Sequence, residues 1–179
     1  QDKKGNPHVY EKIWAKSFPE QTGVVNFDKE SCMLQVGLDS GTVIFYRTTQ
    51  EGRFLDYEEV CKIKPHTARV MGLAFDSKPG YIYSCGSDNK FMLSEINYVG
   101  NITEIAQSNA GYTNLEFDKK NERIFLTNEA GILSVFLTNS FPPSLVNVIQ
   151  THSTHCIRGL DIDYTKHYIF TGTNTGDIS

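Results

Sequence analysis

Residues 72–94 read GLAFDSKPGYIYSCGSDNKFMLS, and this stretch gives the clearest indication of the fold. A short apolar run ends in Phe75-Asp76, and a polar turn separates it from a second apolar run at residues 81–84. A second turn, residues 86–90, leads to a third run at residues 91–94. Gly, Asp and Asn suit tight hairpin turns because they tolerate positive φ. We therefore expect three short antiparallel strands here.

The same pattern occurs four times along the chain. The first strand of each unit closes on an Asp, and these stand at residues 28, 76, 118 and 163, with steps of 48, 42 and 45. The turns after the second strands end at residues 41, 90, 131 and 176, with steps of 49, 41 and 45. A weaker fourth strand is expected in three units, at residues 57–62, 102–106 and 145–149. Two sets of landmarks with one period indicate an internal repeat.

Four short antiparallel strands in each unit predict an all-β fold, a β-propeller with about four blades that is incomplete. We find no long apolar stripe of helical period that would compete with this interpretation. The expected organisation is a partial propeller over residues 1–179, divided as follows: the last strand of a preceding blade at 8–16, blades at 20–64, 65–107 and 108–150, and a truncated blade at 151–179.

Composition excludes several classes of function. The net charge is −4, from 17 basic and 21 acidic residues, which argues against a nucleic-acid partner because such proteins need a basic face. No apolar run approaches the roughly 18 residues of a membrane span, so we expect no direct membrane insertion. The chain starts without the apolar segment of a signal peptide. Its four cysteines include no C-x-x-C pair, so we expect reduced core thiols and a cytoplasmic protein.

The second unit carries a recognisable set of polar residues. It resembles the WD40 repeat, in which an opening His, a Ser or Thr ending the second strand, an Asp in the next turn and a Trp in the third strand form a hydrogen-bonded network. His66, Ser84 and Asp88 match the first three positions, and Leu93 stands at the fourth. The resemblance implies that these three side chains stiffen the blade.

The other units match the WD40 pattern in part. In the last unit His152 and Thr171 match, while Asn174 replaces the acid. In the first unit Asp39 matches and Tyr46 replaces the Trp. The third unit lacks an opening His and has Ser-Asn-Ala at residues 108–110. A WD40 propeller usually has seven blades, so the resemblance implies that this chain holds about half of one.

A narrower resemblance is to the WD-repeat propellers that carry a FYVE zinc finger. It rests on VGLDSGTV at residues 36–43, on Trp14 followed by Phe18-Pro19, and on GSDNKF at residues 86–91. It implies a parent protein that acts as an adaptor peripheral to endosomes or vesicles. The FYVE module, which would bind phosphoinositide, is absent from this chain, so no lipid-binding residue carries over.

Motifs that suggest chemistry have simpler explanations in the repeat. His152, His155 and Cys156 could ligate a metal, but His152 is also the opening His of a blade. The turn at residues 39–42 is similar to the Asp-box of sialidases, yet a plain hairpin turn accounts for it. A Gly-x-Ser-x-Gly motif and a glycine-rich phosphate loop are both missing from the sequence. We expect no enzyme activity, no catalytic residue, no metal and no cofactor.

Binding is the remaining function. The loops that enter each first strand line one face of a propeller, and Arg69, Tyr112 and His155 lie in such loops. Arg and Tyr are enriched in binding hot spots. We expect a non-catalytic scaffold or adaptor that binds proteins or peptides through these residues. The alternative is a permanent structural subunit of a large multiprotein assembly. A third hypothesis, an enzymatic propeller, would require a hydrolase activity that depends on Asp39 or Asp88.

Overall fold

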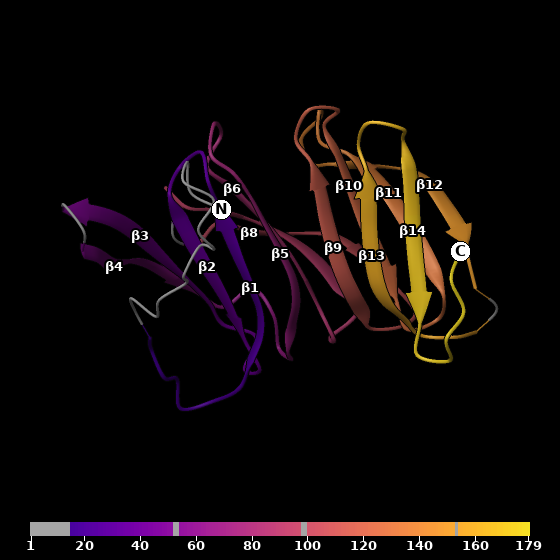
Figure 1. Ribbon diagram of the computed structural model, residues 1–179, viewed down its shortest axis with the longest axis horizontal. Coiled ribbons are helices and arrows are strands. Elements are labelled where there is room, and N and C mark those ends of the chain that lie inside the picture. Colours follow the sequence, from indigo (N-terminus) through magenta and orange to yellow (C-terminus); the bar gives the residue numbers. More distant parts are fainter. Residues whose placement is uncertain (1–14, 52–53, 98–99, 153) are drawn as a thin grey trace, which may run out of the picture.

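The computed structural model describes residues 15–51, 54–97, 100–152 and 154–179. These residues form fourteen β-strands, and no helix occurs among them. Three sheets have four strands and one has two, and every strand pairing is antiparallel (Figure 1). The predicted all-β class is confirmed.

Each four-stranded sheet pairs its strands in chain order, and we call the sheets blades one to four. Blade one consists of β1 (Thr22–Asp28), β2 (Met33–Leu38), β3 (Val43–Glu51) and β4 (Phe54–Ile63). Blade two consists of β5 (Val70–Asp76), β6 (Tyr81–Gly86), β7 (Lys90–Glu95) and β8 (Ile102–Gln107). Blade three consists of β9 (Tyr112–Asp118), β10 (Arg123–Asn128), β11 (Ile132–Leu137) and β12 (Ser144–Gln150). Blade four consists of β13 (Ile157–Asp163) and β14 (Tyr168–Thr173).

The repeated Asp at the end of each first strand closes the following turn. Asp118 Oδ1 accepts the Asn121 backbone N–H at 3.2 Å, and Asp163 Oδ1 accepts the Thr165 N–H at 2.9 Å. Asp28 bonds Ser31 in the same way. A side-chain carboxylate that accepts a nearby N–H forms an Asx turn, which explains why this position keeps its residue type in all four units.

The second turn of each blade contains one residue with positive φ. These are Gly41 (85°), Asn89 (68°), Gly131 (78°) and Gly176 (94°). In the second blade the turn landmark is therefore Asn89 and not residue 90, which begins β7. With this correction the turn landmarks repeat the 48, 42 and 45 steps of the Asp positions.

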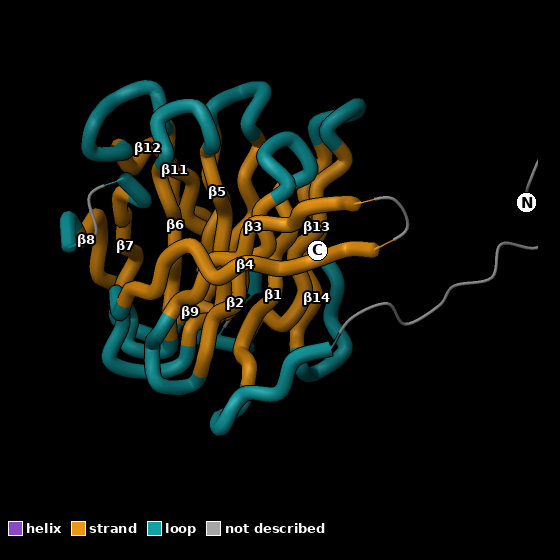
Figure 2. The backbone as a smooth tube through the Cα atoms, turned by 90° about the vertical axis from the view of Figure 1, so that its left-hand side faces the viewer, coloured by secondary structure: helices purple, strands orange, loops and turns teal. Residues whose placement is uncertain are grey.

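The blades pack face against face around their first strands. β1 contacts β5, β5 contacts β9, and β9 contacts β13. Aromatic side chains fill the joints: ring centroids lie 6.0 Å apart for Phe45 and Phe75, and 5.0 Å apart for Phe91 and Phe136. Figure 2 shows the loops gathered at the two ends of the strands. The described residues do not close a ring, and the arrangement is that of an incomplete propeller, as predicted.

The first and last parts of the chain bear on the predicted blade limits. The strand expected at residues 8–16 falls almost entirely outside the described residues, as does Trp14. At the other end Ile178 bridges to Gly172, and the backbones of Thr171 and Ser179 exchange two hydrogen bonds of 2.9 Å.

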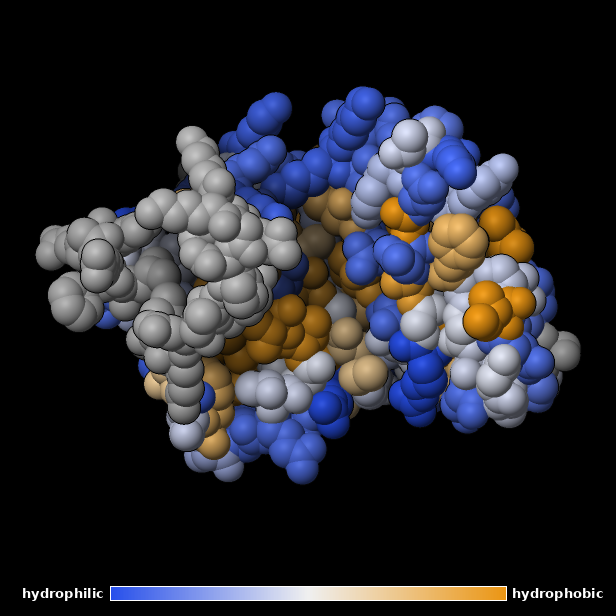
Figure 3. All heavy atoms as spheres, viewed as in Figure 1, coloured by the Kyte–Doolittle hydropathy of each residue, from blue (hydrophilic) through white to orange (hydrophobic). Residues whose placement is uncertain are grey.

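Apolar side chains gather where β1 and β5 lie, and smaller groups lie over β13 and β14 (Figure 3).

Candidate functional site

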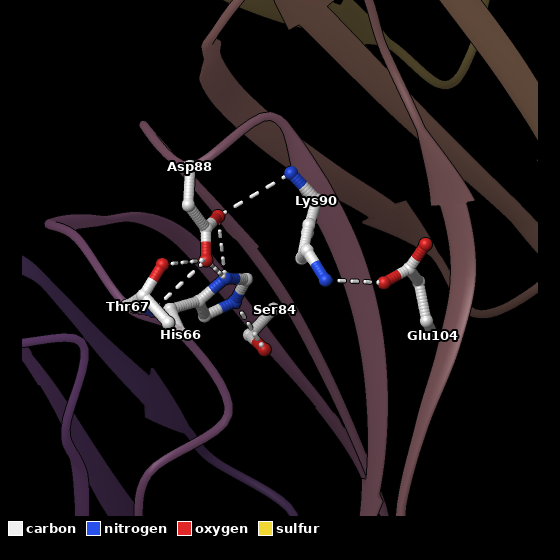
Figure 4. Close-up of polar contacts among 6 residues, drawn as sticks. All are labelled: His66, Thr67, Ser84, Asp88, Lys90 and Glu104. Atoms are coloured by element: carbon white, nitrogen blue, oxygen red, sulfur yellow. Dashed lines mark hydrogen bonds and ion pairs between the residues drawn. The ribbon is translucent and has the colours of Figure 1, made fainter.

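A buried polar network connects blade one to blade two at the start of β5. His66 is 2% exposed and follows the chain out of β4, Ser84 lies on β6, and Asp88 lies in the turn before β7. His66 Nδ1 lies 2.9 Å from Asp88 Oδ1, and His66 Nε2 lies 2.9 Å from Ser84 Oγ (Figure 4). The Thr67 backbone N–H donates to Asp88 Oδ2 at 2.9 Å. The structure thus brings the three predicted residues together.

Burial decides the protonation state of this network. It lowers the pKa of His66 and outweighs the neighbouring Asp88 carboxylate, which acts in the opposite direction. Burial also acts to raise the pKa of Asp88, but hydrogen bonds from the Thr67 N–H and from His66 hold that pKa below its usual range. A neutral imidazole then donates from Nδ1 to Asp88 and accepts the Ser84 hydroxyl at Nε2. Because these donors and acceptors are paired, the network can hold the loop before β5, which contains His66, against the turn before β7, which contains Asp88.

The remaining WD40-type positions differ between blades. Leu93, at the Trp position, is 1% exposed in the core between blades two and three. In blade four His152 Nε2 lies 3.0 Å from Thr171 Oγ1. Asn174, at the acid position, donates its backbone N–H to the Cys156 carbonyl at 3.2 Å. The hydrogen bond from the opening His to the second strand is therefore present in blade two, as His66 to Ser84, and in blade four, as His152 to Thr171.

Sequence reasoning missed two replacements for this network. In blade three Asn128 Nδ2 donates to Ser108 Oγ at 2.9 Å. In blade one the carboxylate of Glu20 accepts the Ser40 N–H at 2.6 Å. Both bonds join the loop before a first strand to the turn after a second strand, as His66 and Asp88 do. The two residues of each pair are separated in sequence by nearly the same number of positions as His66 and Asp88. The pairs could not be recognised from that spacing because their residue types differ from blade to blade.

A backbone hydrogen bond repeats this connection in all four blades. In each blade a backbone N–H of the turn donates to a backbone carbonyl of the loop, at 2.9 to 3.2 Å. The donor and acceptor pairs are Asp39 and Gln21, Ser87 and Arg69, Glu129 and Gly111, and Asn174 and Cys156. Each pair is eighteen residues apart. The loop that enters each first strand is therefore tied to the same turn in every blade. Loops held this way can present side chains in a fixed arrangement.

Two of the three predicted contact residues are partly accessible. The Arg69 side chain is 41% exposed, its Nε lies 3.2 Å from Asp39 Oδ1, and it donates to the Thr22 carbonyl at 3.1 Å. Asp39 therefore joins blades one and two instead of contacting an opening His. The His155 side chain is 44% exposed, and its Nδ1 lies 3.4 Å from Asp177 Oδ2.

Tyr112 differs from the expectation. It is 4% exposed and lies in the core between blades two and three. Burial raises the pKa of its hydroxyl to about 12. Because the first residue of β9 points inward, its ring does not belong to the surface that a partner would touch.

The metal motif of the last blade is divided among different contacts. His152 bonds Thr171, His155 pairs with Asp177, and Cys156 Sγ lies 3.8 Å from the Ile157 carbonyl. Across the described ranges, no group of three or more His, Cys, Asp or Glu side chains is placed to hold a metal ion. No described helix is long and apolar enough to cross a membrane.

The cysteines are free but not all in the core. Cys61 and Cys85 are buried, and burial raises the pKa of both thiols. Cys32 is exposed in the turn after β1, and Cys156 is intermediate. The expectation of core thiols is therefore wrong for Cys32, whose positive φ of 55° places it in a surface turn.

A small pocket of about 220 Å³ lies along the first strands of blades one to three. An ion pair of 2.6 Å between Lys119 Nζ and Asp28 Oδ1 joins blade three to blade one there. Burial, and secondarily Asp161, raises the pKa of the pocket residue Glu116. The ion pair therefore links the first strand region of blade one to that of blade three, on either side of blade two.

The fold and the polar network define the class, an incomplete WD40-like β-propeller. No protein-family profile matches the chain. It is 23% identical over 177 residues to human WD repeat and FYVE domain-containing protein 2, covering 94% of this chain and 40% of that protein. The mouse protein of the same name is 22% identical over 167 residues, covering 88% and 38%, respectively. The chain thus spans about two fifths of these relatives.

The fold has a clear counterpart among solved structures. The crystal structure of the computationally designed Ika4 protein, a designed propeller, superposes with a TM-score of 0.71 at 15% sequence identity. The superposition covers 96% of this chain and 97% of that one. The likeness at this identity concerns the fold alone.

Proposed function

We propose that the chain is part of a non-catalytic protein-interaction scaffold that binds proteins or peptides through the loops entering its first strands. One observation carries this proposal: the same backbone bond, eighteen residues apart, ties these loops to the turns in all four blades. A preorganised loop loses less conformational entropy on binding, so loops held by this bond should bind a partner more tightly than free loops would. The proposed blade limits remain 20–64, 65–107, 108–150 and 151–179.

The location of the parent protein is a second part of the proposal. The curated relatives carry a FYVE domain in their names. This supports a cytoplasmic adaptor peripheral to endosomes or vesicles, with any phosphoinositide binding supplied by a FYVE module and not by this chain. We propose no nucleic-acid partner, because the net charge is −4.

The scaffold proposal is tested with peptides selected from a display library on the 179-residue chain. Arg69→Gln and His155→Gln should each weaken binding of the selected peptides about tenfold, the effect of a hot-spot residue. Arg47→Gln, an exposed change on β3, serves as the matched control. Equal losses for Arg47→Gln and Arg69→Gln, at unchanged stability, would contradict a binding site in the loops.

A second candidate is a permanent subunit of a large assembly, which the exposed apolar strands favour. Val25 and Phe27 on β1 are 59% and 46% exposed, and Val146 and Val148 on β12 are 51% and 53% exposed. Permanent interfaces are more apolar than transient ones. If the parent protein can be purified only together with another subunit, the assembly is the better explanation and the adaptor proposal fails.

A further inference from the structure

The outermost strand of blade three is an exposed, apolar edge. β12 is the end strand of its sheet, so one of its edges has no neighbouring strand among the described residues. Every residue of β12 is exposed. Its apolar residues are Leu145, Val146, Val148 and Ile149, which are 53%, 51%, 53% and 39% exposed, respectively. An exposed apolar edge strand is a template for pairing with another chain.

The short fourth blade does not account for this exposure. Leu145 lies opposite Phe136 and Val148 lies opposite Ser134, so both side chains are on the side of the sheet that carries Phe136. Phe136 packs on Phe91 of blade two. Leu145 and Val148 therefore point to the side of a neighbour that has all four of its strands, and they are exposed all the same.

The outer strands of blades one and two carry charges where β12 has a valine. Val148 lies opposite the third residue after the positive-φ residue of the turn. The residues opposite the same turn position are Lys62 in blade one and Glu104 in blade two. Glu104 forms an ion pair of 2.6 Å with Lys90. Charged side chains on an edge strand hinder pairing with other chains, and blade three lacks this protection.

The distribution of charge indicates which partner fits the edge. Residues 130–157 contain no Asp, Glu, Lys or Arg, although the whole chain has a net charge of −4. Two copies that met through β4 would bring Asp56, Glu58 and Glu59 against the same acids of the other copy. Two copies that meet through β12 avoid such repulsion. The edge of β12 is therefore complementary to itself.

The backbone of β12 allows a symmetric pairing. The Thr151 N–H donates to the Gly131 carbonyl at 3.1 Å, which directs Thr151 toward β11. By alternation Ile149 also faces β11, whereas the N–H and carbonyl groups of Val148 and Gln150 face the open edge. A two-fold axis at Ile149 places Val148 of each copy opposite Gln150 of the other. Each of these two pairs can exchange two backbone hydrogen bonds.

We propose that two copies of this chain form a symmetric dimer through β12, whose two strands pair antiparallel and join two four-stranded blades into one sheet. Leu145 and Val148 of both copies then form an apolar cluster on the same side of that sheet. The dimer is independent of the loop surface proposed above, because β12 lies at the outer edge of its sheet and the loops lie at the strand ends (Figure 2).

Sedimentation of the 179-residue chain between about 1 and 200 µM should show a monomer that converts to a dimer. Val148→Lys should raise the dissociation constant at least about tenfold, because it brings two like charges together beside the axis. Its urea midpoint should not change, since Lys62 occupies the equivalent position of blade one. Val60→Lys, the same change at a valine of β4 that is 40% exposed, is the matched control and should leave dimer formation unchanged.

A charge exchange separates an interface from a purely structural role of Val148. Val148→Glu alone should weaken the dimer as Val148→Lys does. An equimolar mixture of the two variants should form a mixed dimer at least as tightly as the unchanged chain, because opposite charges then meet. Amide hydrogen exchange of the unchanged chain should slow at Val148 as its concentration rises. Exchange at Ile149, whose N–H faces β11, should change less.

Four results would overturn the proposal. One is a chain that stays monomeric up to about 200 µM. Another is association that Val148→Lys leaves intact, which would assign the contact to a different surface. The third is a mixture of the Lys and Glu variants that associates no better than either alone. The fourth is protection of Val148 only in the presence of a different protein, which would make β12 an interface between unlike chains.

Discussion

His66 and Asp88 show how single residues stiffen this fold. The imidazole is buried and neutral, with one nitrogen donating to the Asp88 carboxylate and the other accepting from Ser84. Asp88 also accepts the Thr67 and Lys90 backbone N–H groups, at 2.9 and 3.3 Å. One carboxylate thus fixes both the loop before β5 and the turn before β7. Removing a buried partner leaves the other groups unsatisfied, which costs more than the bond itself contributes.

The change Asp88→Asn should lower the free energy of unfolding by about 1–3 kcal/mol, because the amide keeps the size but cannot accept all of these donors. Urea unfolding followed by circular dichroism measures the effect. Asp56→Asn, at an exposed position of β4, is the control and should change stability by less than about 0.5 kcal/mol. Equal effects of the two changes would contradict the role given to Asp88.

The lowered pKa of His66 predicts a direction for the pH dependence of stability. The folded state binds the proton less readily than the unfolded state, whose His has a pKa near 6.5. The contribution of neutral His66 is therefore complete above pH 6.5 and is lost as the pH falls below it. Asp88, whose pKa is also lowered, adds a further loss as the pH falls through and below 3.8.

Unfolding free energies measured between about pH 7.5 and 5 should fall with pH for the unchanged chain, and more weakly for His66→Gln. A slope for His66→Gln as steep as that of the unchanged chain would assign the pH dependence to other groups.

At the scale of the strands and turns, a glycine in the second turn allows the blade to meet its neighbour. Gly41 has a φ of +85°, and a Cβ there would lie 2.1 Å from the His66 carbonyl oxygen. Gly131 has a φ of +78°, and a Cβ would lie 2.2 Å from the His152 carbonyl oxygen. Both the backbone conformation and the space exclude a side chain, and backbone atoms cannot move aside cheaply.

Gly41→Ala and Gly131→Ala should therefore each lower the free energy of unfolding by more than about 2 kcal/mol. Gly172→Ala on β14 is the matched control, because a Cβ there meets no atom within 4 Å. Its stability should stay within about 0.5 kcal/mol of the unchanged chain. Thermal or urea unfolding of the three variants measures these changes in the free energy of unfolding. An unchanged free energy for Gly41→Ala would contradict the close approach of this position to the His66 carbonyl.

At the scale of the whole molecule, contacts between blades hold the chain together. Phe136 of blade three packs at 5.0 Å on Phe91 of blade two, and Phe117 packs at 5.4 Å on Tyr83. The ion pair of Lys119 with Asp28 joins blades one and three. Because each blade buries its faces only against its neighbours, we expect the described blades to unfold in a single cooperative step.

Phe136→Ala should lower the free energy of unfolding by about 3–5 kcal/mol, through the lost burial and the cavity that remains. Phe170→Ala on β14 removes the same side chain from a position that is 48% exposed, and should cost less than about 1 kcal/mol. Urea unfolding monitored by two probes measures both values. Two separate transitions in the unchanged chain would show that the blades are independent.

Local features were predictable from the sequence, and features between blades were not. The Asp of each first turn could be recognised because an Asx turn is made within a few residues. The Glu20–Ser40 and Ser108–Asn128 bonds were missed because geometry preserves the connection while the residue types change. Tyr112 was expected at the surface and is buried, since its side-chain direction depends on the neighbouring blade.

Local patterns of residues specify the strands, the turns and the repeat of about 45 residues, and through them the propeller class. Alternation of apolar residues and turn chemistry are local properties, so they can be recognised in a single unit. Packing between the blades sets which faces are covered. It also brings Lys119 to Asp28 across 91 positions of sequence and places Arg123 beside an apolar groove. These features depend on distances between separate blades, which no local pattern of residues specifies.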